Sequence, residues 1–234
     1  MQEITQSLSL AFGLIASLND TMMSIAGLSL RVSGVAVLAA SLLALPIGAW
    51  LGLARFPGRQ GVIAILNGMM GLPPVVVGLL VYLLLSRAGP LGALGILFTP
   101  AAMMVAQALL IFPIIAALVR QVIEDAWGEY REQLTSLNAS RSQAMRALLW
   151  DTRFTLTTAV LAGFGRAIAE VGAVMIVGGN IDGVTRVMTT AIALETSKGD
   201  LPLALALGIV LIAMVVAINL AAQVIKSTAM KRHG

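Results

Sequence analysis

Long runs of apolar residues, separated by short polar connections, dominate the pattern of this chain. A helix that crosses the ~30 Å hydrocarbon core of a bilayer needs about 20 consecutive apolar residues. Runs of this length predict spanning helices near residues 26–54, 61–86, 98–122, 154–178 and 200–225. The chain lacks the unbroken period-two alternation of membrane barrel strands. The pattern therefore predicts an all-α fold, a polytopic membrane helix bundle of five transmembrane helices that forms one transmembrane domain over residues 1–234.

The first apolar stretch, residues 4–18, is too short to cross a bilayer. Its apolar residues recur every three or four positions and form one stripe, made of Ile4, Leu8, Ala11, Ile15 and Leu18. A short amphipathic helix of this kind is typical of a segment that lies in the membrane interface. We therefore expect an N-terminal interfacial helix rather than a sixth span.

One long polar segment, residues 123–152, separates the third and fourth predicted spans. Apolar residues keep helical spacing on both sides of Asn138, namely Leu134 and Leu137 before it and Ala144 and Leu148 after it. Asn tolerates the left-handed conformation that ends a helix, and Ser140 can cap the next one. The segment predicts two amphipathic helices joined by a tight turn. Their apolar faces need burial, and the spacing leaves open whether a partner protein or the chain's own helix ends provide it.

Composition agrees with a membrane location, because 59% of the residues are hydrophobic and only 15 basic and 11 acidic residues are present. A soluble domain carries roughly twice this charged fraction, so lipid must be the solvent for much of the surface. The absence of cysteine excludes disulfides and thiolate metal sites. The basic residues are dispersed at helix ends rather than clustered in a stripe, which argues against a nucleic-acid partner.

The distribution of Lys and Arg over the connections predicts the orientation. One side of the predicted bundle collects Arg55, Arg59, Arg120, Arg131, Arg141, Arg146, Arg153, Lys226, Lys231 and Arg232. The other side has Arg31, Arg87, Arg186 and Lys198. Because cytoplasmic loops carry the excess of basic residues, we expect the N-terminus outside, and the C-terminus and residues 123–152 in the cytoplasm.

Two ionisable residues, Arg166 and Glu170, lie within the fourth predicted span. Ionisable groups at membrane depth are costly and usually mark a functional site. They lie four positions apart on one helical face and can pair with each other. The pair could have a structural or gating role, or the residues could contact an anion directly. Pro73 and Pro74 predict a kink in the second span. A kinked segment can line a path or gate, or simply pack, and the sequence leaves these alternatives open.

Residues 132–151 resemble the EAA loop of ABC-importer permeases. That family's pattern is Glu-Ala-Ala, a glycine after three further residues, and two apolar positions after nine more. Here Glu132 and Asn138 hold the first and the glycine positions, and Leu148 and Trp150 hold the apolar positions. The chain departs from the pattern at Gln133-Leu134, Asn138 and Asp151, where the family has Ala-Ala, Gly and Pro. Asn suits a positive-φ turn, whereas the missing proline leaves the end of the loop less defined.

Two further stretches resemble permeases of the molybdate and tungstate type. Gly165-Arg-Ala-Ile-Ala-Glu-Val-Gly-Ala-Val is similar to their Arg-x-x-x-Glu-[Phe/Val]-Gly-Ala motif, and Leu72-Pro-Pro-Val-Val-Val-Gly to the Leu-Pro-Pro-x-Val-x-Gly run of their second core helix. The closing run, residues 178–200, is most similar to the tungstate-specific branch. The resemblance implies a translocation path or gate at Pro73, Pro74, Arg166, Glu170 and Gly172. It also implies coupling to an ATPase through Glu132, Leu134, Leu137, Asn138, Ala139, Ser140 and Arg141.

The resemblance implies a non-catalytic permease subunit of an ABC importer that moves an oxyanion, most readily tungstate, across the inner membrane of a bacterium or archaeon. Its partners would be a second permease copy in a homodimer, two cytoplasmic ATPase subunits and an extracytoplasmic oxyanion-binding protein. The chain has no Walker A pattern, so ATP and Mg would bind to the ATPase, and we expect no cofactor, metal or catalytic residue here. The alternatives are a molybdate or sulfate permease, a secondary transporter with an Arg166/Glu170 ion relay, and a membrane scaffold that only recruits a cytoplasmic protein.

Overall fold

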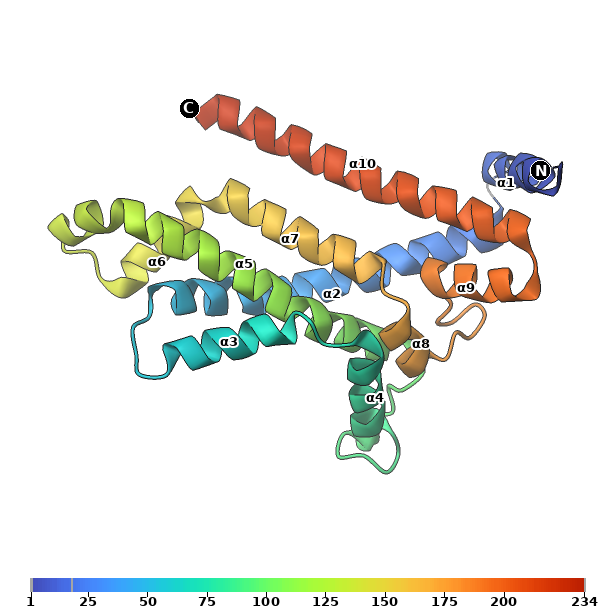
Figure 1. Cartoon of the computed structure of the whole chain (residues 1–234), viewed down its shortest axis with the longest axis horizontal. Helices are drawn as coiled ribbons and strands as arrows, with labels where there is room; N and C mark the ends of the chain where they lie inside the picture. Colours follow the sequence, from blue (N-terminus) through green and yellow to red (C-terminus); the bar gives the residue numbers. More distant parts are fainter. Residues whose placement is uncertain (1, 18, 234) are drawn as a thin grey trace. The chain divides into compact units, whose positions relative to one another are not determined.

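A computed structural model describes residues 2–17 and 19–233, and within this part of the chain every regular element is a helix (Figure 1). The helices are α1 (Gln2–Ala16), α2 (Asp20–Leu53), α3 (Arg59–Met69), α4 (Pro74–Leu85), the short 3-10 helix η1 (Gly92–Leu94), α5 (Pro100–Ser136), α6 (Arg141–Asp151), α7 (Arg153–Ile168), α8 (Gly172–Gly178), α9 (Met188–Lys198) and α10 (Leu201–His233). The all-α prediction is confirmed.

Three of the described helices, α2, α5 and α10, are long and apolar enough to cross a membrane by themselves. The pairs α3 with α4 and α7 with α8 meet the same test only when each broken pair is taken as one span, which brings the number to five. Large apolar side chains face outward along these helices, including Leu42 at 76%, Ile65 at 67% and Ile212 at 67% exposure. A protein in water rarely exposes so much apolar surface. The chain is therefore a polytopic membrane protein.

The stretches 61–86 and 154–178, each predicted as one helix, are both broken. In the first, α3 ends at Met69, and Pro73 and Pro74 stand at the N-cap and first position of α4. Proline is tolerated there because the first helical N–H groups have no partner within the helix. The expected kink within one helix is therefore a break between two helices. In the second stretch, α7 ends at Ile168 and α8 starts at Gly172.

The chain forms two compact units, and each is assembled from three separate segments. Unit 1 consists of residues 1–35, 73–107 and 168–221, and unit 2 consists of residues 36–72, 108–167 and 222–234. One boundary between the units falls in the break between α3 and α4, and another falls one residue before the end of α7. The helices α2, α5 and α10 continue through the other boundaries.

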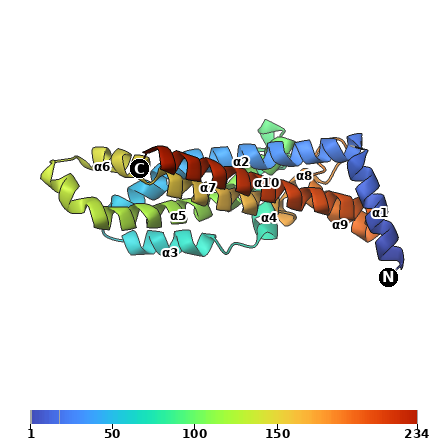
Figure 2. The same ribbon diagram turned by 90° about the horizontal axis from the view of Figure 1, so that it is seen from above.

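In unit 1, α1 packs beside the start of α2, α9 and the first half of α10 (Figure 2). Ala11 of α1 is fully buried in a cluster with Met22, Met188 and Leu207. Ile15 packs against the same cluster, and so does Leu14, which is not part of the predicted stripe. Leu18 and the side chain of Ile4 lie outside the described residues, and the stripe and the placement of α1 in the membrane interface stay predictions.

In unit 2, small residues let α2, α5 and α7 approach closely. A Cβ atom on Gly48 would come within 2.6 Å of the Ala116 carbonyl oxygen, and one on Gly163 within 2.6 Å of Ile115 Cδ1. Such glycine contacts are typical of helix interfaces in membranes, where backbone proximity increases dispersion attraction. They bring the middle of α5 into close contact with α2 and α7.

Candidate functional site

The polar segment forms the predicted helix, turn and second helix, and we call residues 123–151 the hairpin (Figure 1). Its first arm is the continuous end of α5 rather than a separate helix, and its second arm is α6. Asn138 adopts φ 50°. The Asn138 N–H donates to the Thr135 carbonyl, and the Ala139 N–H donates to the Leu134 carbonyl, both at 3.0 Å. This pair of backbone hydrogen bonds is the Schellman motif at the end of a helix, with Asn138 at the left-handed position.

Ser140 starts the second arm with a complete capping box. Its hydroxyl accepts a hydrogen bond from the Gln143 N–H at 3.3 Å, and its own N–H donates to the Gln143 side-chain oxygen at 2.8 Å. Two otherwise unpaired helix donors are satisfied in this way. The predicted turn at Asn138 and cap at Ser140 are both confirmed.

The apolar residues of the hairpin divide into an inward and an outward set. Ala144 and Leu148 are each 2% exposed, whereas Leu137 is 76% and Trp150 70% exposed. Of the other residues predicted for coupling, Glu132, Ser140 and Arg141 are exposed, and Leu134 and Ala139 are half-buried. The chain itself thus buries one set, and the other set remains free to contact a partner.

Polar residues of the two arms lie close together near the base of the hairpin. Tyr130 of α5 lies beside Asp151 at the end of α6, and the charges of Asp151 and Glu129 raise the pKa of its phenol. The Arg153 guanidinium lies 4.5 Å from the centre of the Trp150 ring and 4.4 Å from that of Phe154.

A charged cluster at the base of α5 joins three helices of unit 2. Glu124 pairs with Arg59 at 3.2 Å and with Arg120 one turn earlier in α5. Arg59 also donates from Nε to the Leu51 carbonyl at 3.1 Å, which ties the start of α3 to α2. The sequence pattern did not predict this cluster. The four-residue spacing of Arg120 and Glu124 was a usable signal, but nothing in the sequence pointed to Arg59.

Glu170 lies in the break between α7 and α8 and is only 3% exposed. Its Oε1 accepts from the Ala173 N–H at 3.0 Å, and its carbonyl accepts from Thr189 Oγ1 at 2.8 Å. The prediction that Arg166 and Glu170 share one helical face is wrong, because α7 ends between them at Ile168. Arg166 sits in the last turn of α7, while the Glu170 carboxylate caps α8.

The starts of α4 and α8 lie against each other in unit 1 (Figure 1). A Cβ on Gly172 would come within 2.8 Å of Val75 Cγ2, and one on Gly78 within 2.8 Å of Ala173 Cα. The fold thus brings together four of the residues predicted for a path or gate, Pro73, Pro74, Glu170 and Gly172. Arg166 belongs to unit 2.

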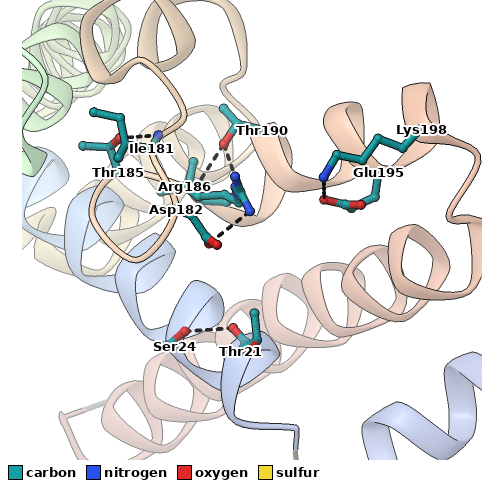
Figure 3. Close-up of polar contacts among 10 residues, drawn as sticks. Thr21, Ser24, Ile181, Asp182, Thr185, Arg186, Thr190, Glu195 and Lys198 are labelled. Carbon is teal, nitrogen blue, oxygen red and sulfur yellow. Dashed lines mark hydrogen bonds and ion pairs between the residues drawn. The ribbon is translucent and has the colours of Figure 1, made fainter.

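The polar loop between α8 and α9 is internally bonded (Figure 3). Thr185 Oγ1 donates to the Gly178 carbonyl at 2.6 Å and accepts from the Ile181 N–H at 2.9 Å. Asp182 and Arg186 form an ion pair at 3.0 Å. Thr190 caps α9 by accepting from the Val187 N–H at 3.1 Å. These hydroxyls therefore serve as turn and helix caps.

The fold and the hairpin define a class of protein, a polytopic α-helical membrane protein whose third long apolar segment extends into a capped helical hairpin. No protein-family model matches the chain. It is 40% identical to the tungstate uptake system permease protein TupB of Peptoclostridium acidaminophilum, over 94% of this chain and 96% of that protein. It is 38% identical to the probable anion ABC transporter permease protein of Haloferax volcanii, over 88% and 91%. It is 30% identical to the molybdenum transport system permease protein ModB of Escherichia coli K12, over 74% and 80%.

These matches extend over most of both chains in each comparison. The chain belongs to the family of ABC transporter permease subunits.

Proposed function

We propose that the chain conducts tungstate into the cytoplasm as the permease subunit of an ATP-driven importer. The observation that carries this proposal is the similarity, over nearly the whole chain, to a permease named for tungstate uptake. Molybdate is the second candidate, because a molybdenum permease matches a large part of the chain as well. Sulfate remains a third candidate within the same family.

The proposed contact with a separate ATPase consists of five exposed residues of the hairpin, Glu132, Leu137, Ser140, Arg141 and Trp150. Leu137 and Trp150 expose apolar surface, and Glu132, Ser140 and Arg141 are exposed polar residues of the same hairpin. Exposed apolar side chains among polar ones are typical of a protein-binding site. Because the first arm continues α5 without a break, movement of the ATPase would be transmitted directly into a membrane helix. ATP and Mg would bind to the ATPase.

The contact between α4 and α8, with Glu170 buried beside it, is the proposed gate of the translocation path. Short helix segments at membrane depth are tolerated where they line a cavity or the protein interior. Pro73 and Pro74 stand at the start of α4 and Gly172 at the start of α8, and Arg166 lies in the last turn of α7, before the break. Small movements of two short helices can open or close a path that a continuous helix would block.

The remaining parts of the proposed assembly follow from the family. They are a second copy of this chain, two ATPase subunits and an extracytoplasmic oxyanion-binding protein. Only 17% of the most apolar stretch of α10 is buried within the chain, so the rest of this helix surface can contact lipid and a second copy. The excess of Lys and Arg on one side supports an inner-membrane orientation with the N-terminus outside and the hairpin in the cytoplasm.

Reconstitution tests the transport proposal directly. The permease is purified with the ATPase encoded beside it and placed in liposomes. Tungstate, molybdate and sulfate uptake and ATP hydrolysis are then measured with and without the loaded binding protein. We expect ATP-dependent tungstate uptake and stimulated hydrolysis. The absence of a stable complex and of stimulation would contradict the importer, whereas uptake of molybdate or sulfate alone would contradict the choice of tungstate.

A charge reversal tests the proposed role of the hairpin. We expect Glu132→Lys to abolish uptake while the permease still inserts and folds, because the exposed carboxylate faces the proposed ATPase contact. Asp125→Lys is the matched control, since Asp125 is also exposed and lies two turns, or roughly 10 Å, closer to the membrane on the same helix. Equal uptake by both variants would rule out Glu132 as a coupling residue.

A further inference from the structure

Two adjoining cavities open at the base of the hairpin in unit 2. They measure about 240 Å³ and 330 Å³ and share Leu53, Arg55, Trp127 and Arg131 as lining residues. Arg141 lines the first, and Arg59 and Glu124 line the second. We call this space the arginine cavity. It shares Arg141 with the proposed ATPase contact, and it includes Arg55, Arg59 and Trp127, to which the proposed function assigns no role.

The arginine cavity has a strong excess of positive charge. Among its lining residues Glu124 is the single carboxylate, and Arg59 and Arg120 already occupy its two oxygens. Within the described residues, Arg55, Arg131 and Arg141 form neither a hydrogen bond nor an ion pair through their guanidinium groups. Arg55, Arg131 and Arg141 all line the first cavity and are exposed. Like charges that line one cavity repel each other, and an anion bound among them would reduce this repulsion.

The chemistry of these side chains selects the kind of anion. A guanidinium presents planar, paired N–H donors that match the oxygen atoms of phosphate-like groups, and it remains charged at every physiological pH. The three arginines come from separate segments, Arg55 from the loop after α2, Arg131 from α5 and Arg141 from the first position of α6. Donors that converge from several directions suit a tetrahedral oxyanion better than a flat carboxylate.

We propose that the arginine cavity is a binding site for a tetrahedral oxyanion, supplied either as a free anion or as the phosphate of an acidic phospholipid headgroup. Basic pockets between helices on the cytoplasmic side of a membrane bind such headgroups, and Trp127 and Leu53 give the cavity an apolar wall. An anion held by Arg131 and Arg141 links the two arms of the hairpin and joins them to the end of α2. The binding itself does not depend on the proposed transport, although the cytoplasmic location of the cavity rests on the proposed orientation.

Binding to the full-length permease tests the proposal without the ATPase, the binding protein or ATP. The protein is placed in nanodiscs of phosphatidylcholine alone, and inorganic phosphate and tungstate are added while the heat of binding is measured by calorimetry. In parallel, native mass spectrometry measures the retention of phosphatidylglycerol against phosphatidylcholine. Saturable binding of an added anion identifies the free oxyanion, and selective retention of phosphatidylglycerol identifies the lipid.

The variants locate whichever ligand is bound. We expect Arg131→Gln combined with Arg141→Gln to weaken binding at least tenfold, and Arg55→Gln to weaken it independently. Arg146→Gln is the matched control, because Arg146 is an exposed arginine of α6 that does not line the cavity. Circular dichroism checks the helical content of each variant. Binding of neither ligand by the wild-type permease, or equal binding by the Arg55 and Arg146 variants, would overturn the proposal while leaving the transport experiment unaffected.

Discussion

Two leucines of the hairpin differ in burial, and mutating each of them gives a matched comparison. Leu148 is 2% exposed in α6, whereas Leu137, directly after α5, is 76% exposed. Changing either to Ala removes the same atoms, so a difference between the variants must come from the environment. We expect Leu148→Ala to loosen α6, and Leu137→Ala to leave it in place.

The expected size of the effect follows from this burial. Truncation of a fully buried leucine costs about 2–5 kcal/mol, because transfer free energy is lost and a cavity remains. Since about 1.4 kcal/mol corresponds to a factor of ten, even the low end raises the population with α6 open about 30-fold. Substitutions at exposed positions usually change stability by no more than about 0.5 kcal/mol, which is a change of about twofold.

Hydrogen–deuterium exchange with mass spectrometry measures these openings locally. Peptides covering Arg141–Asp151 report on α6, and peptides covering Met188–Lys198 in unit 1 provide an internal reference. We expect faster exchange in α6 for Leu148→Ala, with the reference unchanged. The same two variants also test function, since Leu137→Ala should weaken association with the ATPase while its exchange stays like that of the wild type.

Equal exchange of α6 in both variants would refute the division into an inward and an outward set. So would normal ATPase association of Leu137→Ala together with a loss of association only in Leu148→Ala. In that case the outward apolar residues would have no part in binding the partner.

Three further predictions concern a close helix contact, the turn of the hairpin and the cap of α6. Gly78→Ala should destabilise unit 1 by about 1–3 kcal/mol, because the new Cβ would lie 2.8 Å from Ala173 Cα. Thermal unfolding should show a lower unfolding temperature for this variant. It should show no decrease for Gly34→Ala, whose Cβ meets no atom within 4 Å. Asn138→Val should destabilise the hairpin by about 1–3 kcal/mol, since a β-branched residue is strained at φ 50°, whereas Asn138→Gly should keep wild-type exchange in α6. Ser140→Ala should cost about 1 kcal/mol through loss of the cap and raise exchange in the first turn of α6.

Each of these has an outcome that contradicts it. Equal unfolding temperatures for Gly78→Ala and Gly34→Ala would show that α4 and α8 are not in backbone contact. Wild-type exchange in Asn138→Val would contradict the left-handed turn, and unchanged exchange in Ser140→Ala would contradict the capping box.

Much of the hairpin was predictable from sequence because its signals act within a few residues. Asn138 ends one helix and Ser140 begins the next through hydrogen bonds to backbone groups no more than a few positions away. The long apolar runs likewise predicted α2, α5 and α10, since the length needed to cross a bilayer is a property of each run by itself.

The helix breaks required more than local patterns. Pro73 and Pro74 signalled an interruption but not its form, and the run from 154 to 178 contains no proline at all. Its break at Glu170 is held by the carboxylate that caps α8 and by the hydroxyl of Thr189 from α9. Thr189 is a partner from another helix, so the interruption could not be deduced from spacing within the run.

The sequence by itself determined that the chain is helical, lies in a membrane and carries a capped polar hairpin, because hydrophobicity, turn chemistry and helix capping are local. Only the tertiary structure decided that Leu148 of the hairpin is buried while Leu137 is exposed. It also decided that the starts of α4 and α8 meet near Gly172, and that Arg59 pairs with Glu124. These outcomes depend on side chains that are distant in the chain and become neighbours only when helices pack. The arginine cavity has the same origin, since Arg55, Arg131 and Arg141 converge from three segments that no sequence pattern connects.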